Sequence, residues 1–406
     1  MHKTIKLSEK YDRCVIANKD TLLTISLFLY IFARGIEMAE IAEWAIPYFG
    51  IFSRLVQITA LVIAGSLFFN SILHHCAVTN ILLLFVGVIL LICCSFSQSY
   101  ELIWGYLFIV SAENTSIRGL PKIVFYCALL ILFSVIALHI TGVAETVVIG
   151  RSDSAELRNS LGFYHPNRLV EVYLLAVLSY LMYKYNNIKL IDCGVIAVSC
   201  LIIYGVTGTR TVLFAVAMTI TVFILAQQMS THNRNLPTTV LPMLFLLIAL
   251  ASVFATLLYD ENSSFLNFIN NILSGRLIYP SALYSAVGIP LFGMNMEGTS
   301  ELISNVPYFS SDVVPIDNYY NHVVFYNGPF VLLIEFIVLY SISKYTSYSK
   351  YSVYYLGLMI CIILGVSESY VGDVAFNFSI LLAAPAMVEF DSRVRKYVQV
   401  NDEKLN

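Results

Sequence analysis

The chain has 406 residues, of which 58% are hydrophobic and only 12% are charged, and its mean hydropathy is +0.78. A soluble globular protein carries about 25% charged residues, so the composition excludes that class. The formal net charge of −3 is small, so the information lies in how the charges are distributed along the chain.

Apolar runs of roughly 17–25 residues, the length that a helix needs to cross a bilayer, recur along the whole chain. We therefore predict an all-α polytopic membrane protein with about twelve transmembrane helices, forming a single integral membrane domain over residues 1–406. The fourth span is the weakest, because acidic residues and an asparagine interrupt it. The predicted spans lie near 21–39, 48–69, 80–97, 101–116, 122–142, 167–183, 190–206, 211–228, 239–259, 318–343, 351–367 and 374–390.

Lysine and arginine are distributed unequally across these spans. With both termini in the cytoplasm, the inner segments collect 16 Lys and Arg against seven on the outer side, which satisfies the positive-inside rule. Every lysine falls on the inner side, and the outer cations are all arginine: Arg34, Arg54, Arg151, Arg158, Arg168, Arg210 and Arg276. Arginine presents a planar, permanently charged fork that matches phosphate and carboxylate, so we predict an anionic ligand at the outer surface.

Two predicted outer segments are long, residues 143–166 and residues 260–317. The second is a large extracytoplasmic loop, which is too short and irregular for an independent catalytic domain. Its glycine, proline and aromatic residues indicate short helices that pack back onto the membrane domain. Long ordered loops of this kind often carry function.

The first candidate cluster is RSDSAELRNSLGFYHPNR, where segment 143–166 enters the sixth span. Pro166 suits a helix start. Alternatively, these arginines have only an anchoring role, in which they reach lipid head groups and pair with neighbouring acids. The cluster contains the candidate substrate-binding residues Arg151, Arg158, His165, Asn167 and Arg168.

The second cluster is the tight turn TGTR, Thr207 to Arg210, between the seventh and eighth spans. A turn of this size can simply connect two helices. However, a lone arginine there is unusual, and the N-terminus of a helix starting near Thr211 adds partial positive charge beside it. We predict an anion site at Arg210.

Two further clusters lie in and after the long loop. They are SGR, Ser274 to Arg276, with PLFGMN following it, and IDNYYNH at the start of the tenth span. Asp317 and His322 are titratable groups suited to proton transfer, although either could instead be a surface residue and Asp317 a helix N-cap.

The sequence also suggests a role or a partner for four more acidic residues. Glu368 and Asp373, in the last outer turn, are candidates to orient one of the arginines or are simply solvated. Glu171 and Glu335 are ionisable groups at membrane depth, which usually face a cavity or a partner. The sequence has no ATP-binding glycine-rich loop and no metal-ligand spacing, so an ATP-driven pump is not supported.

The four clusters, in this order, resemble the Wzy-type polysaccharide polymerases of bacterial capsule and O-antigen assembly, within the O-antigen ligase and polymerase superfamily. The matching elements are GFYHPN (162–167), TGTR (207–210), SGR with a later glycine segment (274–295) and DNYY with a later glycine (317–328). O-antigen ligases share much of this layout, but Asp317 stands where the ligase motif has histidine. His322 lies one turn away, so the choice between polymerase and ligase stays open.

The resemblance implies a glycosyltransferase in the bacterial cytoplasmic (inner) membrane that joins undecaprenyl-diphosphate-linked oligosaccharides at its outer face. It assigns the diphosphate to Arg276 and Arg210, and the second lipid-linked donor to Arg151 or Arg158. Asp317 or His322 would take the hydroxyl proton. We expect no metal and no other cofactor, because preorganised arginines can stabilise a departing diphosphate.

The implied binding partners are the lipid-linked oligosaccharides and membrane lipids, with a chain-length regulator and a flippase of the same pathway as candidate partners and no nucleic acid. Asn318 and Tyr320 are further candidate substrate-binding residues. Two alternatives remain: a ligase transferring glycan to a lipid A core, and a flippase or other transporter. A transporter should place cations through the midplane of its helices, whereas here they concentrate at one face.

Overall fold

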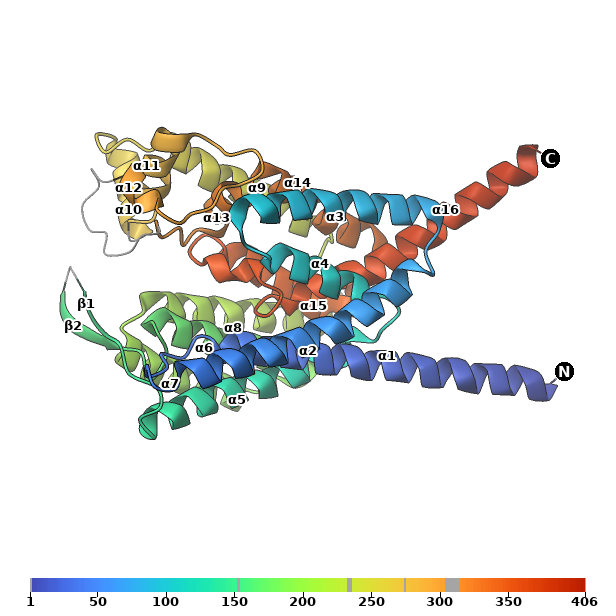
Figure 1. Cartoon of the computed structure of the whole chain (residues 1–406), viewed down its shortest axis with the longest axis horizontal. Helices are drawn as coiled ribbons and strands as arrows, with labels where there is room; N and C mark the ends of the chain where they lie inside the picture. The colour runs from blue at the N-terminus through green and yellow to red at the C-terminus, as the bar shows by residue number, and fades with distance from the viewer. Residues whose placement is uncertain (1, 152–153, 232–235, 274, 304–313, 406) are drawn as a thin grey trace. The chain divides into compact units, whose positions relative to one another are not determined.

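The computed structural model describes residues 2–151, 154–231, 236–273, 275–303 and 314–405. The fold is nearly all-α, and the chain divides into two compact units, each built from two separate stretches (Figure 1). Unit 1 comprises Met1–His74 and Leu107–Asn235, and unit 2 comprises His75–Tyr106 and Leu236–Asn406. The sequence predicts one membrane domain over 1–406, and the structure distinguishes these two units within it.

Unit 1 is a bundle of long helices. Helix α1 packs on α2 and α5, α5 packs on α6, and α8 packs on both α6 and α7. Prolines stand in the first turn of α2, α5 and α6, where a missing backbone N–H costs no hydrogen bond. The helices are α1 (His2–Ile36), α2 (Ile46–Ile72), α5 (Leu120–Ile140), α6 (Pro166–Lys184), α7 (Leu190–Thr207) and α8 (Arg210–Thr231). The residues of α4 (Glu101–Ser111) are divided between the two units.

A β-hairpin interrupts unit 1, which the all-α prediction missed. Strands β1 (Val148–Arg151) and β2 (Ser154–Asn159) pair antiparallel, with Val148 opposite Asn159. The β-branched run from Thr146 to Ile149 favours an extended strand over a helix. The hairpin projects beyond the helix ends of its unit (Figure 1).

Unit 2 combines membrane-length helices with a group of short ones. The helices α10, α11 and α12 lie together at one end of the unit (Figure 1). Its helices are α3 (Ala77–Ser97), α9 (Val240–Leu257), α10 (Ser264–Ile272), α11 (Ile278–Val287), α12 (Thr299–Leu302), α13 (Tyr319–Tyr326), α14 (Pro329–Tyr345), α15 (Tyr348–Leu364) and α16 (Ala383–Leu405).

The segment between α9 and α13 has a hydrophobic core of its own, as the sequence indicates for an ordered loop with short helices. Leu283 on α11 and Phe325 on α13 are both buried in it. This packing orders the segment against α13. The buried core residues are Leu283, Met296, Ile303, Val314, Ile316 and Phe325.

The predicted tenth span, 318–343, is broken into α13 and α14. Gly328, at φ +86°, lies between them, and Pro329 begins the second helix. The break is packed backbone to backbone. A Cβ on Gly328 would lie 2.2 Å from the carbonyl oxygen of Leu291, and one on Gly293 would lie 2.0 Å from that of Tyr326. The glycines therefore let the 290–294 segment cross directly over the break.

Aspartate 391, beyond the last predicted span, joins α16 to the start of α3. Its carboxylate accepts hydrogen bonds from the backbone N–H of Cys76 at 3.1 Å and from Arg395 Nε at 2.6 Å. Burial alone would raise the pKa of Asp391, but the hydrogen bonds from Arg395, Thr79 and Cys76 outweigh burial and hold the pKa below its usual range.

Helices occur within all twelve predicted ranges, but the last range begins with irregular chain and the 3₁₀ turn Phe378–Leu382. Within the part of the chain that the structure describes, six helical segments are long and apolar enough to cross a membrane, which supports a membrane protein. Helices α4 and α15 are apolar but shorter, and twelve spans remain a prediction. The six are Ile46–Ile72, Ala77–Ser97, Ile117–Ile140, Leu190–Thr207, Arg210–Thr231 and Val240–Leu257.

Candidate functional site

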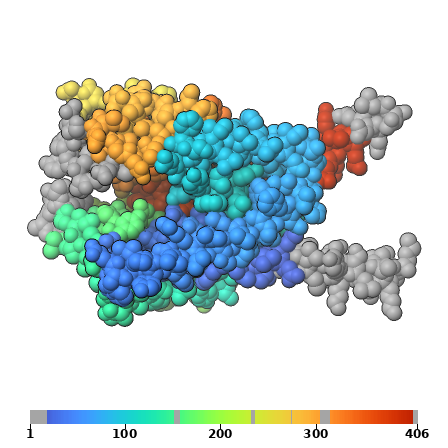
Figure 2. Space-filling model, viewed as in Figure 1, coloured from blue at the N-terminus to red at the C-terminus, as the bar shows by residue number. Residues whose placement is uncertain are grey.

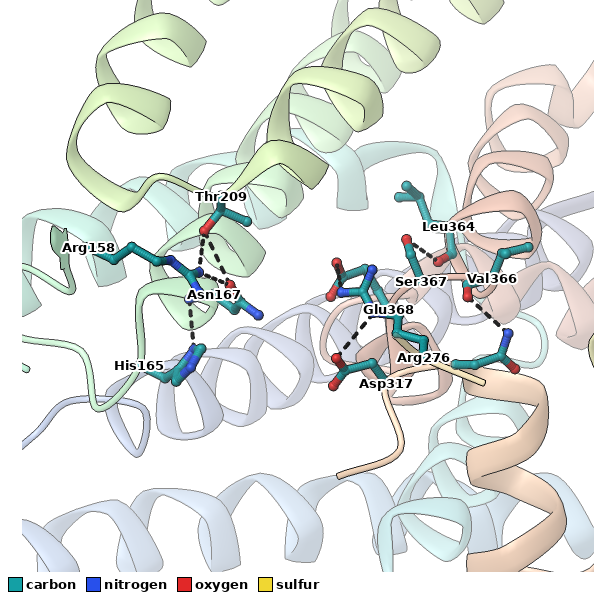
Figure 3. Close-up of polar contacts among 11 residues, drawn as sticks. Arg158, His165, Asn167, Thr209, Arg276, Asp317, Leu364, Val366, Ser367 and Glu368 are labelled. Carbon is teal, nitrogen blue, oxygen red and sulfur yellow. Dashed lines mark hydrogen bonds and ion pairs between the residues drawn. The ribbon is translucent and has the colours of Figure 1, made fainter. Parts of the chain in front are cut away.

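In unit 1, the first and second sequence clusters meet around Arg158. Its Nε donates to the carbonyl oxygen of Thr207 at 2.8 Å, and its Nη2 donates to Asn167 Oδ1 at 2.6 Å and to Thr209 Oγ1 at 2.8 Å. Thr209 also donates to Asn167 at 3.2 Å, so the three side chains form one network (Figure 3). A residue of strand β2 is thereby fixed to the start of α6 and to the α7–α8 turn.

The shape of the TGTR turn depends on Gly208. This residue ends α7 at φ +60°, and a Cβ on it would lie 3.1 Å from Arg158 Cγ. The turn can therefore wrap closely around the arginine stem. Arg210, the last residue of the TGTR turn, is exposed and is the first residue of α8. This start lies one position before the one predicted from the sequence.

His165 has a structural role at the start of α6. Its Nδ1 accepts a hydrogen bond from the backbone N–H of Asn167 at 3.1 Å, so the histidine is the N-cap, and Pro166 begins the helix as predicted. A neutral imidazole that accepts at Nδ1 carries its proton on Nε2. The cap therefore fixes the backbone of Asn167, whose side chain accepts a hydrogen bond from Arg158 (Figure 3).

Arg168 is engaged by a buried carboxylate. Its Nη1 lies 2.7 Å from Glu171 Oε2, and its guanidinium lies 5.3 Å from the ring centroid of Tyr164. The predicted partner of the buried Glu171 is thus confirmed. Arg151 lies at the end of β1, and its side chain is outside the described part of the chain.

In unit 2, the third and fourth clusters meet around Arg276. Its Nε lies 3.2 Å from Asp317 Oδ2, and its Nη2 lies 3.6 Å from Glu368 Oε1 (Figure 3). The Arg276 and Glu368 side chains are only 16% and 10% exposed, whereas Asp317 is 50% exposed. The sequence left two roles open for Glu368, orienting an arginine or simple solvation, and the structure shows the contact with Arg276. Ser274 lies outside the described residues.

Residues 318–321 hold α13 rather than face solvent. Asn318, not Asp317, is the N-cap: it accepts from the backbone N–H of Asn321 at 3.0 Å and donates to the carbonyl oxygen of Val366 at 2.9 Å. Tyr320 is fully buried, and its hydroxyl donates to the carbonyl oxygen of Ile362 at 2.5 Å. Asp317 is therefore displayed just before a rigidly anchored helix.

Helix α9 supplies two partners to α13 that the sequence analysis missed. Ser252 accepts from Asn318 at 3.3 Å, and Thr256 accepts from Asn321 at 2.8 Å. The two hydroxyls are four positions apart in a helix that is otherwise strongly apolar, so they share one face. That spacing was the signal available in the sequence.

His322, the second candidate base, and Glu335 in the tenth predicted span both have aromatic neighbours. His322 stacks on Tyr326, with ring centroids 4.0 Å apart and an interplanar angle of 16°. Glu335 accepts a hydrogen bond from the hydroxyl of Tyr319, which confirms a partner for this acid. Asp317, the first candidate base, contacts Arg276.

The two clusters differ in charge. Arg158 donates to three neutral oxygens, which fix the orientation of its guanidinium. Arg276 instead sits between two carboxylates, a triad with a formal charge of −1. The first arrangement suits anion binding, and the second suits a carboxylate held in a fixed orientation.

An apolar hollow in unit 1 is separate from these residues. It lies among the ends of α1 and α5 and the start of α2, and none of the predicted site residues lines it. Its lining residues are Phe32, Ile36, Phe49, Phe52, Ser134, Ala137, Leu138 and Thr141. Arg151, Arg158, Arg168 and Arg210 belong to unit 1, whereas Arg276 belongs to unit 2.

The fold and its apolar helices define the class as a helical membrane protein with two polar clusters built on arginine. Comparisons of the chain with protein-family models, with curated proteins and with solved structures find no match.

Proposed function

We propose that the protein is a polymerase of undecaprenyl-diphosphate-linked oligosaccharide repeat units at the outer face of a bacterial cytoplasmic membrane. The observation that carries this proposal is the pairing of the four sequence clusters. The first joins the second around Arg158, and the third joins the fourth around Arg276. Residues far apart in the chain thus assemble two polar sites, each built around an arginine.

The Arg158 site is the candidate for binding a diphosphate. Asn167, Thr209 and the Thr207 carbonyl oxygen fix its guanidinium. Arg210 adds a second cation next to Thr209, at the N-terminus of α8, where the helix dipole also favours an anion. A preorganised pair of arginines stabilises negative charge at little reorganisation cost.

Asp317 is the candidate general base. In the proposed reaction, a hydroxyl oxygen of the incoming repeat unit attacks the anomeric carbon of the growing chain, and a new C–O bond forms. The bond from that carbon to the diphosphate breaks, and its electron pair leaves with undecaprenyl diphosphate. The hydroxyl proton moves to the half-exposed carboxylate of Asp317.

Arg276 takes a different role from the one expected of it. Because Asp317 and Glu368 already surround it, we assign it to orienting the Asp317 carboxylate rather than to gripping the diphosphate. Asn318 and Tyr320 are buried, so in this proposal they position α13 and do not touch substrate. Arg168, engaged by Glu171, anchors the start of α6.

The test is a reaction of the purified protein in lipid nanodiscs with undecaprenyl-diphosphate-linked repeat units as the only substrate. Ladders of increasing glycan length, with release of undecaprenyl diphosphate, support the polymerase. Product formed only after a lipid A core is added indicates a ligase. Movement of the lipid-linked unit between leaflets without any new glycosidic bond indicates a transporter.

A matched pair of variants identifies the base. Asp317→Asn keeps the side-chain shape but cannot accept the proton, so polymerisation should fall by about 10²–10⁴-fold with only a small decrease in the melting temperature. His322→Gln should retain activity within a few-fold, because His322 stacks on Tyr326. The opposite result, an active Asp317→Asn and an inactive His322→Gln, would move the base to His322.

A further inference from the structure

Helix α10 exposes three large apolar side chains and buries a polar one. Phe265, Phe268 and Ile272 are 70%, 63% and 65% exposed. They lie at spacings of three and four, so they share one face of the helix. On another side of the helix, Asn270 is buried, with only 4% of its surface exposed. This is the reverse of a helix that packs on a protein core and faces water.

The asparagines of α10 form hydrogen bonds with polar groups in the segments just before and just after the helix. Asn270 Oδ1 accepts from the backbone N–H of Leu277 at 3.0 Å, and the Asn270 carbonyl oxygen accepts from the backbone N–H of Gly275 at 2.8 Å. Asn267 accepts from the hydroxyl of Tyr259 at 3.0 Å. The contacts of Asn270 tie α10 to the turn that carries Arg276, and that of Asn267 ties it to the segment that follows α9.

The location of α10 in the chain indicates what covers its apolar face. Helix α9 is a candidate membrane span with an exposed apolar stripe that includes Leu247, Leu250 and Phe254 and ends at Leu258. Helix α10 begins at Ser264, six residues after that stripe ends. The chain therefore reaches α10 just as it leaves the hydrocarbon region.

The composition of α10 also fits a lipid surface. Its nine residues, SFLNFINNI, contain no charge, whereas Asp260 and Glu261 lie just before it. The space-filling view shows the yellow-to-orange stretch of unit 2, which follows α9, on the molecular surface (Figure 2). An apolar face with two phenylalanines, exposed beside the end of a membrane span, is stable in the head-group layer and unfavourable in water.

We propose that α10 is an interfacial helix that lies in the surface layer of the bilayer, with Phe265, Phe268 and Ile272 inserted among the lipid acyl chains near the head groups. Through Asn270 it holds the Arg276 turn at that depth. The proposal concerns membrane depth and goes beyond the proposed reaction, so it can fail or succeed independently of the polymerase assignment.

The experiment measures the depth of a tryptophan placed on α10. Phe268→Trp is made in a background without the two natural tryptophans, Trp44→Phe with Trp104→Phe, and reconstituted in phosphatidylcholine nanodiscs. Lipids brominated near the carbonyl end of the acyl chain should quench it at least twofold more strongly than lipids brominated near the chain centre. Asn271→Trp, at the edge of the apolar face, is the matched control and should be quenched mainly by aqueous iodide.

Two results would overturn the proposal. Strong iodide quenching of Phe268→Trp without quenching by brominated lipid would place the face in water. Protection from both quenchers would show that protein, such as a second copy of the chain, covers it. If the background variant fails to fold, the same quenching is measured as the difference between Phe268→Trp and the otherwise natural chain.

Discussion

Arg276 forms two ion pairs, one more buried than the other. We expect the more buried pair to have the larger coupling energy, even though its atoms lie farther apart. The Asp317 contact is the shorter, 3.2 Å against 3.6 Å for Glu368. Asp317, however, is 50% exposed and Glu368 only 10% exposed. We predict that the Arg276–Glu368 pair is the stronger, because water and salt screen an exposed charge.

The magnitudes follow from the local dielectric. At an effective dielectric of about 20, unit charges roughly 3.5 Å apart attract by on the order of 5 kcal/mol before desolvation is counted. After desolvation, a mostly buried pair retains about 1–3 kcal/mol of coupling. The half-exposed Asp317 pair should fall to about 0.2–1 kcal/mol because of solvent screening.

Double-mutant cycles measure both couplings. The variants Arg276→Gln, Glu368→Gln and Asp317→Asn are unfolded reversibly in mixed micelles, singly and in the two relevant pairs. Arg276→Lys belongs to the same series, since one ammonium cannot bridge both carboxylates as the guanidinium does. A coupling to Asp317 equal to or larger than that to Glu368 would refute the burial argument. Full catalytic activity of Arg276→Lys would refute the positioning role.

Three further outcomes are expected. Gly328→Ala should lower the free energy of unfolding by about 2–4 kcal/mol, because its Cβ meets a backbone carbonyl oxygen, whereas Gly288→Ala, also at positive φ but in open space, should cost about 1 kcal/mol in the same titration. Asp391→Asn should lower the melting temperature at pH 7. The difference from the natural chain should shrink as pH falls below about 4, because a carboxylate with a lowered pKa stabilises the fold above its unfolded pKa and loses that contribution as it protonates. Thr209→Val removes one acceptor of Arg158 and should raise the KM for the lipid-linked substrate about tenfold with little change in kcat; an unchanged KM would remove Thr209 from the site.

Much of the helical fold follows from hydropathy, because a bilayer leaves few ways to satisfy backbone hydrogen bonds. Helix starts at Pro166 and near Thr211 could be predicted from local signals, and the structure places them at Pro166 and Arg210. The β-hairpin and the break at Gly328 could not, because both depend on what the segment packs against. The 290–294 segment crosses Gly328 from more than thirty residues away in the chain.

The candidate site shows the same division. The sequence by itself determined which residues carry the chemistry: arginines in place of lysines, the Asp-Asn pair and the acids near the last turn. Only the tertiary structure decided their roles. It fixed Arg158 with neutral oxygens and surrounded Arg276 with carboxylates. It also buried Asn318 and left Asp317 half exposed.

The physical reason is that the residue type sets the chemical properties of a side chain, whereas the groups packed around it set the role that it takes. The charge and shape of a guanidinium are local properties that any sequence displays. Whether that charge is left to bind an anion or is neutralised by an acid depends on contacts such as that of Arg276 with Asp317, which are 41 residues apart and meet only in the folded chain.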